Sequence, residues 1–148
     1  IQWTQPLINP QKTGLIAYIT KKINGVLHFL IQAKVEPGNF DTIEMAPTVQ
    51  CITDSFEQDK PEDRPPFLDY VLNVSPEKIR SSTMQSEEGG RFYRESNRCL
   101  IIEADDDFSL EVPKNFIWLT LSQIKEFIKY NNYVNVEGRC LLSSIRFV

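Results

Sequence analysis

The sequence predicts one α+β domain built around a mixed β-sheet, with a helix near its C-terminal end. Three observations predict this class: two β-rich runs flank Asn24-Gly25, several shorter strand-like runs follow, and apolar residues at helical spacing occupy 121–130. Runs of strands followed by a helix are typical of the α+β class. A length of 148 residues, of which 41% are hydrophobic, suits one domain with its own core.

The Asn24-Gly25 dipeptide favours a type I′ turn, because both central residues of that turn need positive φ. Antiparallel strands are therefore expected at 15–23 and 26–35, with Ile23 opposite Val26. The same register places Lys21, Ile19, Ala17 and Leu15 opposite His28, Leu30, Gln32 and Lys34. One face is then almost purely apolar and is predicted to face the core: Ile16, Tyr18, Leu27, Phe29, Ile31, Ala33 and Val35. The opposite face mixes polar and apolar side chains, which predicts the wall of a cleft.

Turn residues, capping signals and short apolar runs divide the rest of the chain. Further strands are predicted at 48–53, 91–94, 99–103 and 133–136. Polar or charged loops are predicted at 59–66, 86–90 and 105–107. Ser75-Pro76 suits the start of a short helix. The helix at 121–130 begins after Thr120, which lies three residues before Gln123, the spacing of a capping box.

Composition excludes several classes of function. With 16 basic and 20 acidic residues the net charge is −4, which argues against a protein that binds the backbone of nucleic acids. Since no apolar run approaches the roughly 18–20 residues that span a bilayer, no membrane span is predicted. Cys51, Cys99 and Cys140 lie far apart without CxxC spacing, which predicts free thiols in the cytoplasm, with no disulfide framework and no metal site.

A first group of candidate functional residues shares one side of the second hairpin strand. His28, Gln32 and Lys34 span about 20 Å at about 3.3 Å per residue, so an extended ligand can meet all three. A lysine in a half-buried cleft can act as an acid or base, or bind phosphate or an oxyanion. A solvated sheet face with an incidental histidine and lysine is the alternative.

A second group lies in the short segment 86–94. Glu87 and Glu88 precede Gly89-Gly90, and Arg91 and Arg94 follow. Glycines permit close approach of the backbone to a ligand, arginines bind diphosphate through paired hydrogen bonds, and a glutamate can remove a proton from carbon. A Gly-Gly turn edged by solvated charges is the alternative.

Five segments in a fixed order carry a resemblance to a known family. They are Trp3-x-Gln5-Pro6, His28-Phe29-Leu30-Ile31-Gln32-Ala33-Lys34-x-Glu36-Pro37-Gly38-Asn39, Pro47-Thr48-Val49-Gln50, Ser86-Glu87-Glu88-Gly89-Gly90-Arg91-Phe92-Tyr93 and Trp118-Leu119-Thr120-Leu121. Together they resemble the NDP-hexose 2,3-dehydratases, enzymes of deoxysugar biosynthesis. The resemblance runs from residue 3 to about residue 145.

The resemblance implies a Nudix-like fold and a lyase activity. Family members look like two tandem modules, of which residues 1–148 correspond to one. The implied reaction removes the C3 proton and the C2 hydroxyl of a nucleotide-linked 4-keto-6-deoxyhexose, with no metal or organic cofactor. The implied partners are a nucleotide-diphosphate sugar and either a second module or a second copy of the chain, as in a homodimer.

The resemblance also suggests roles for individual residues. Lys34 is the expected oxyanion stabiliser or proton shuttle. Glu87 or Glu88 is the candidate base, with His28 as an alternate. Arg91 and Arg94 are candidate diphosphate contacts, Trp3 or Tyr93 is a candidate stacking partner of the nucleobase, and four residues are expected to bind sugar hydroxyls: Gln5, Gln32, Thr48 and Gln50.

Two other functions remain open from the sequence. A module of this kind can bind a nucleotide sugar without turnover, if one half of a two-module enzyme lacks a base. A Nudix pyrophosphatase needs a helix that carries Arg-Glu-x-x-Glu-Glu to hold Mg²⁺. Here Thr83-Met84 stand where Arg-Glu is required, so the metal cage lacks ligands.

Overall fold

The computed structural model describes residues 4–10, 12–38, 41–56 and 58–145. The strands are β1 (Gly14–Ile23), β2 (Val26–Lys34), β3 (Glu44–Ala46), β4 (Val49–Ile52), β5 (Ile79–Ser86), β6 (Ser96–Glu103) and β7 (Phe116–Thr120). The helices are α1 (Leu68–Leu72), α2 (Leu121–Ile128) and α3 (Val136–Ser143). Short 3₁₀ turns lie at Thr53–Phe56, Pro61–Asp63, Pro76–Lys78 and Asn131–Tyr133.

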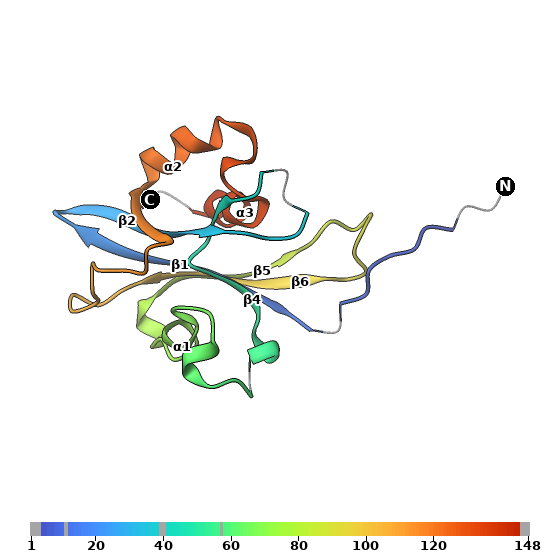
Figure 1. Ribbon diagram of the computed structural model, residues 1–148, viewed down its shortest axis with the longest axis horizontal. Coiled ribbons are helices and arrows are strands. Elements are labelled where there is room, and N and C mark those ends of the chain that lie inside the picture. Colours follow the sequence, from blue (N-terminus) through green and yellow to red (C-terminus); the bar gives the residue numbers. More distant parts are fainter. Residues whose placement is uncertain (1–3, 11, 39–40, 57, 146–148) are drawn as a thin grey trace.

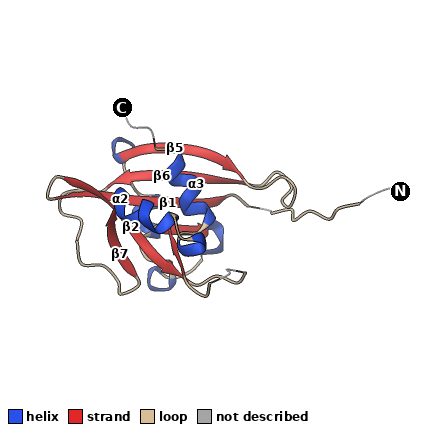
Figure 2. Ribbon diagram, turned by 90° about the horizontal axis from the view of Figure 1, so that it is seen from above, coloured by secondary structure: helices blue, strands red, loops and turns tan. Residues whose placement is uncertain are grey.

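All seven strands form one mixed sheet. Its main order is β3-β2-β1-β6-β5, and β4 and β7 extend it by pairing with β1 and β2. Helix α1 lies against one face, and α2 and α3 lie against the other (Figure 1). Seen from above, α2 and α3 cross the middle strands of the sheet (Figure 2). The predicted α+β class with a mixed sheet and a C-terminal helix is confirmed.

The predicted hairpin forms around Asn24-Gly25. The φ angles of these two residues are 50° and 79°, as a type I′ turn requires. Ile23 lies opposite Val26 and Lys21 lies opposite His28, so the predicted register is confirmed near the turn.

Farther from the turn, the predicted register is wrong because the two strands separate. Residues 14–17 of β1 pair with residues 49–52 of β4, and residues 32–34 of β2 pair with β3. Thr48 fills the point of separation, since its buried hydroxyl accepts the Ile19 N–H at 2.9 Å and donates to the Leu30 carbonyl at 2.5 Å. These bonds satisfy backbone groups that would otherwise be buried without partners. Ala17 and Leu15 consequently face β4 rather than Gln32 and Lys34.

The sheet is buried on both faces. One cluster, under α1, contains Ala17, Ile19 and Leu30, which the sequence prediction had assigned to a cleft wall. The other cluster, under α2 and α3, contains the expected Ile16, Tyr18, Phe29 and Ile31. Leu27, Ala33 and Val35, also predicted for the core, are exposed instead. Helices on both faces explain why the predicted cleft wall is buried, because a sheet covered on both sides needs apolar residues on both sides.

The predicted helix at 121–130 is confirmed as α2. Thr120 accepts the Gln123 N–H at 3.2 Å, and the Gln123 side chain accepts the Thr120 N–H at 2.8 Å, which completes the predicted capping box. The predicted helix start at Ser75-Pro76 is a 3₁₀ turn.

Two predicted strands are wrong. Residues 91–94 form a turn in which Arg94 has a φ of 54°, and a strand cannot continue through this left-handed conformation. Residues 133–136 lead into α3, because Asn135 caps that helix by accepting the Gly138 N–H at 2.9 Å. None of the helices in the described ranges is long and apolar enough to cross a bilayer.

Candidate functional site

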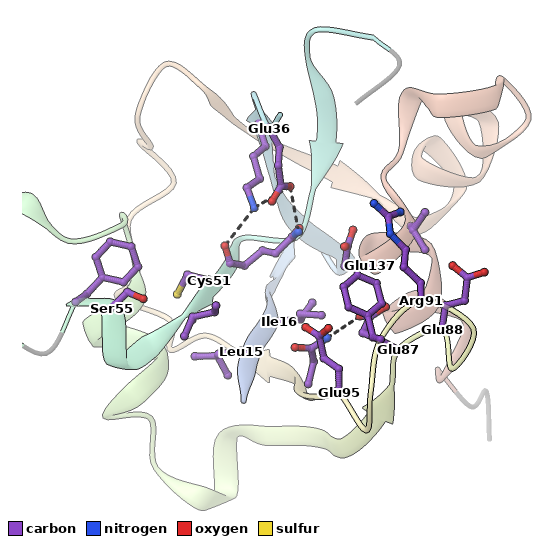
Figure 3. A pocket seen from close by; sticks show the side chains of 18 residues that line it. Leu15, Ile16, Glu36, Cys51, Ser55, Glu87, Glu88, Arg91, Glu95 and Glu137 are labelled. Carbon is purple, nitrogen blue, oxygen red and sulfur yellow. Dashed lines mark hydrogen bonds and ion pairs between the residues drawn. The ribbon is translucent and has the colours of Figure 1, made fainter. Parts of the chain in front are cut away.

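A pocket with a volume of about 660 Å³ opens at one end of the sheet. The first residues of β1 and the last residues of β4 form its base. Its sides come from the end of β2, from the segment between β5 and β6, and from the start of α3 (Figure 3). A Cβ at Gly14 would overlap Oδ1 of Asn97, so a larger residue in the base would displace the Asn97 side chain.

Five of the residues predicted for the site line this pocket. They are Lys34, Gln50, Glu87, Glu88 and Arg91. The fold therefore brings together the end of the second hairpin strand and the glycine-containing segment, the two groups that the sequence singled out separately. A second hollow of about 660 Å³ lies between β5 and the end of α3, and none of the predicted residues lines it.

Lys34 is held in a defined place at the end of β2. Its Nζ lies 3.2 Å from Glu36 Oε2 and donates to the Gln50 carbonyl at 3.3 Å. The Lys34 side chain is only 21% exposed, so water screens this ion pair less than it screens a surface pair. The ammonium is therefore a positioned hydrogen-bond donor at the pocket.

A chain of side-chain hydrogen bonds connects this lysine to α3. The Gln50 amide donates to Glu36 Oε2 at 3.4 Å, and Gln50 Oε1 accepts from Asn135 Nδ2 at 2.7 Å. Asn135 is buried and caps α3 through its own oxygen. Sequence reasoning assigned no site role to Glu36 or Asn135. Glu36 does belong to one of the five segments that carry the family resemblance, and an asparagine is a favoured N-cap residue once the start of α3 is known.

Glu87 and Glu95 both line the pocket, on the side formed by the segment between β5 and β6 (Figure 3). The Glu87 N–H donates to the Glu95 carbonyl at 3.0 Å, so the two residues are opposite one another beyond the last pair of β5 and β6. Glu87 Oε1 accepts from Asn97 Nδ2 at 2.6 Å. Glu88 is more exposed than either carboxylate. Sequence reasoning missed Glu95 because the strand predicted at 91–94 concealed the turn.

Charge is unevenly distributed around the pocket. Five glutamates line it, whereas Lys34 and Arg91 are its only lysine and arginine among the described residues. An acidic cavity repels a phosphate chain, but its oxygens suit a neutral ligand rich in hydroxyl groups. Arg91 is exposed and packs over the Phe92 ring at 5.5 Å, which leaves it suited to an anionic group outside the cavity.

The other predicted residues that lie within the described ranges do not line the pocket. Gln32 donates to the Pro47 carbonyl at 2.8 Å, and Thr48 joins β1 to β2. His28 Nδ1 is 2.8 Å from the Val26 carbonyl oxygen at the hairpin. Arg94 packs over the Tyr93 ring at 5.3 Å, and both are exposed.

The N-terminal segment contributes one described contact near the pocket. Gln5 donates its side-chain amide to the Gly90 carbonyl, beside the pocket-lining Arg91. Trp3 lies outside the described residues. Cys51, which sequence reasoning did not assign to the site, lines the pocket, and burial raises the pKa of its thiol. A thiol shifted in this direction is a poor nucleophile and serves as part of the wall.

Comparison with solved structures identifies the fold. A Nudix hydrolase from M. smegmatis, RenU, matches with a TM-score of 0.53 at 14% identity, covering 93% of this chain and 90% of that one. The C-terminal domain of mouse MUTYH, in complex with human PCNA, matches with a TM-score of 0.55 at 10% identity, covering 90% and 86%. At these identities the likeness concerns the fold alone, which is Nudix-like as expected.

Comparison of sequences identifies the family. Proteins named dTDP-4-dehydro-6-deoxy-alpha-D-glucopyranose 2,3-dehydratase are 46% identical in Saccharopolyspora spinosa, 42% in Streptomyces violaceoruber and 43% in Amycolatopsis orientalis. Each match covers 97–98% of this chain but only 29–32% of the relative's length. A family model described as NDP-hexose 2,3-dehydratase matches residues 1–145. This chain therefore belongs to the NDP-hexose 2,3-dehydratase family.

Proposed function

We propose that this chain acts as one module of a dehydratase for a nucleotide-linked 4-keto-6-deoxyhexose. The observation that carries the proposal is the presence of the Lys34 ammonium and the Glu87 carboxylate around one cavity of sugar-binding size. The names of the relatives support the same substrate class.

The reaction requires three chemical groups. The C4 ketone acidifies the C3 proton, a base removes it, a donor stabilises the C4 oxyanion, and an acid assists the departure of the C2 hydroxyl. We assign the oxyanion to Lys34, which the Glu36 and Gln50 contacts hold in place. Glu87 and Glu88 are the predicted carboxylates that line the pocket, whereas His28 is not among its lining residues, so the base is assigned to a carboxylate.

The distribution of charge suggests how the substrate lies. The neutral sugar ring occupies the acidic cavity, where Gln50 and the glutamates accept from its hydroxyls. The diphosphate extends past Arg91, and the nucleobase lies toward the exposed Tyr93 and Arg94 on the same turn. This orientation keeps the phosphates away from five glutamates.

A partner and a compartment belong to the proposal as well. Since the chain spans about a third of its curated relatives or less, we propose that a second module or a second copy completes the assembly. Sedimentation equilibrium separates a monomer from a dimer. The free thiols at Cys51, Cys99 and Cys140 suit the reducing cytoplasm.

Two alternatives are tested by the same sample. A Nudix pyrophosphatase is disfavoured because residues 79–86 form strand β5, not the glutamate-bearing helix of that activity. A module that only binds the nucleotide sugar would leave the sugar chemically unchanged, which distinguishes it from a dehydratase.

The deciding experiment is incubation of the chain with TDP-4-keto-6-deoxyglucose in D₂O, followed by NMR. The expected result is loss of the C2 oxygen, with deuterium entering at carbons whose protons are removed. Tight binding with no change at C2 or C3 would support the binding module and contradict the dehydratase. Magnesium-dependent release of a nucleoside monophosphate would support the pyrophosphatase.

A further inference from the structure

Glu95 carries an unusual carboxylate. The residue is half-buried and lines the pocket, and its Oε2 is closed off from solvent with no hydrogen-bond partner in the part of the chain that the structure describes. Nearly all buried polar groups in folded proteins have partners, and one that has none calls for a specific explanation, of which a catalytic role is one. A structural carboxylate at this position would instead be expected to bind a donor from the protein.

The placement of Glu95 follows from the register of the β5–β6 hairpin. Ser86 pairs with Ser96, and the Glu87 N–H donates to the Glu95 carbonyl at 3.0 Å, so Glu87 and Glu95 form the next opposed pair. Side chains opposite one another project to the same face, with Cβ atoms about 4.5–5.5 Å apart. Two carboxylates are therefore next to each other on the pocket wall, where like charges disfavour one another.

The two carboxylates differ in how they are held. Glu87 Oε1 accepts from Asn97 at 2.6 Å, which fixes its orientation and leaves the second oxygen free to carry a proton. Glu95 lacks such a donor at Oε2, so no protein hydrogen bond holds this carboxylate, and a proton from a ligand has to be taken at Oε1, because Oε2 is closed off from the pocket. Neighbouring acids in different environments commonly divide the acid and base roles of one reaction.

We propose that Glu95 is the base that removes the C3 proton, and that Glu87 is the acid that protonates the leaving C2 hydroxyl. This inference rests on the proposed dehydratase function. It replaces Glu87 or Glu88 as the base with a residue for which the sequence offered no signal.

The proton balance closes within the carboxylate pair. The C3–H bond breaks and its proton passes to Glu95, while the electron pair forms the enolate whose C4 oxygen Lys34 stabilises. The C2–O bond then breaks, and the hydroxyl takes a proton from Glu87 and leaves as water, so C2 and C3 become doubly bonded. The resulting C3 enol loses its O–H proton as C2 gains one, which gives the 3-ketone. Transfer from Glu95 to its neighbour Glu87 restores the starting state.

The test compares Glu95→Gln, Glu87→Gln and the unaltered chain with TDP-4-keto-6-deoxyglucose in D₂O. Glu126→Gln serves as the matched control, because Glu126 is exposed on α2, where it pairs with Lys129. NMR follows the disappearance of the C3 proton signal, and calorimetry measures affinity for the sugar nucleotide. We expect Glu95→Gln to slow disappearance of the C3 signal by about 100-fold or more, with affinity changed less than about threefold. Glu87→Gln should still exchange the C3 proton but should lose water release.

The outcomes separate this inference from the proposed function. If the unaltered chain removes no C3 proton, the dehydratase proposal fails and the inference fails with it. If the unaltered chain is active and Glu95→Gln removes the proton at a similar rate, only the inference is overturned. Loss of C3 exchange in Glu87→Gln, with normal exchange in Glu95→Gln, would make Glu87 the base and also overturn it. Circular dichroism of each variant excludes unfolding as the cause of a loss.

Discussion

At the scale of single residues, the placement of Lys34 depends on a short-range ion pair rather than on the strand alone. Replacement of Lys34 by alanine removes the proposed oxyanion donor, and we expect kcat for the dehydration to fall by at least about 100-fold. Glu36 loses its ion-pair partner but keeps the hydrogen bond from the Gln50 amide and is 42% exposed, so the fold should persist. The assay is the NMR measurement of dehydration, with Lys22→Ala as the control, because Lys22 is an exposed lysine on β1. A loss under about threefold would remove Lys34 from the mechanism.

A second prediction at this scale concerns Glu44, which lies opposite Lys34 where β2 pairs with β3. Burial raises the pKa of Glu44, and the negative charge of Asp41 raises it further. A carboxyl with a raised pKa is most favourable to the fold below about pH 4, its unfolded pKa, and ionisation costs stability as the pH rises through the folded pKa. We therefore expect Glu44→Gln to raise the melting temperature at pH 7, with the gain disappearing near pH 4. If the increase in melting temperature of Glu44→Gln instead became larger as the pH fell, the predicted direction of the pH dependence would be wrong.

At the scale of elements, a lysine on β1 organises the acidic loop at 105–108. Lys21 is 9% exposed, and its Nζ donates to the carbonyls of Asp105, Asp106 and Phe108 at 2.9, 2.7 and 2.7 Å. The carboxylate of Asp105 binds Lys78 instead, at 2.6 Å. Three consecutive aspartates predict a solvated loop. In the structure, the buried ammonium of Lys21 binds the backbone carbonyl oxygens of this loop and not its carboxylates.

Replacement of Lys21 by methionine should therefore loosen this loop while keeping the apolar stem. We expect the free energy of unfolding to fall by about 2–4 kcal/mol, because three hydrogen bonds to a charged donor are lost but the carbonyls can be rehydrated. Lys22→Met, one residue along and exposed, should change it by less than about 0.5 kcal/mol. Urea unfolding measures both variants. Equal stability of the two would show that the lysine does not hold the loop.

Local signals explain which elements could be predicted. The Asn24-Gly25 turn and the Thr120–Gln123 capping box depend on neighbouring residues, so the hairpin and α2 follow from the sequence. Strand β5 reads Ile-Arg-Ser-Ser-Thr-Met-Gln-Ser and is mostly exposed, so it lacks the apolar alternation that indicates a strand. It forms because β6 offers a partner, which is information held elsewhere in the chain.

The candidate site was predictable only in part for the same reason. Lys34, Glu87 and Arg91 belong to conspicuous segments, and the fold brings them to one cavity. Glu95 enters the site through the pairing of β5 with β6. Thr48 was expected to contact a sugar. Its hydroxyl instead forms hydrogen bonds with β1 and β2 where the two strands separate, and the sequence pattern did not indicate that separation.

At the scale of the whole molecule, one sheet supplies both halves of the core. Leu100 belongs to the cluster under α1, and its neighbour Ile101 belongs to the cluster under α2 and α3. Since both side chains arise from adjacent residues of β6, neither layer can be lost without disturbing the strand that carries the other. The molecule should therefore unfold as one cooperative unit.

Alanine at either position tests this coupling. Leu100→Ala and Ile101→Ala should each lower the free energy of unfolding by about 2–5 kcal/mol, as large-to-small changes in a core do. Both should keep a single urea transition when it is followed by tryptophan fluorescence, which reports on Trp118 in the α1 layer among other sites, and by circular dichroism, which reports on the whole chain. Ile117→Ala, at an exposed position of β7, is the matched control. In Leu100→Ala alone, the fluorescence transition could occur at a different urea concentration from the circular dichroism transition. That result would mean that the two layers unfold independently, because the shared sheet would not have transmitted the loss of one layer to the other.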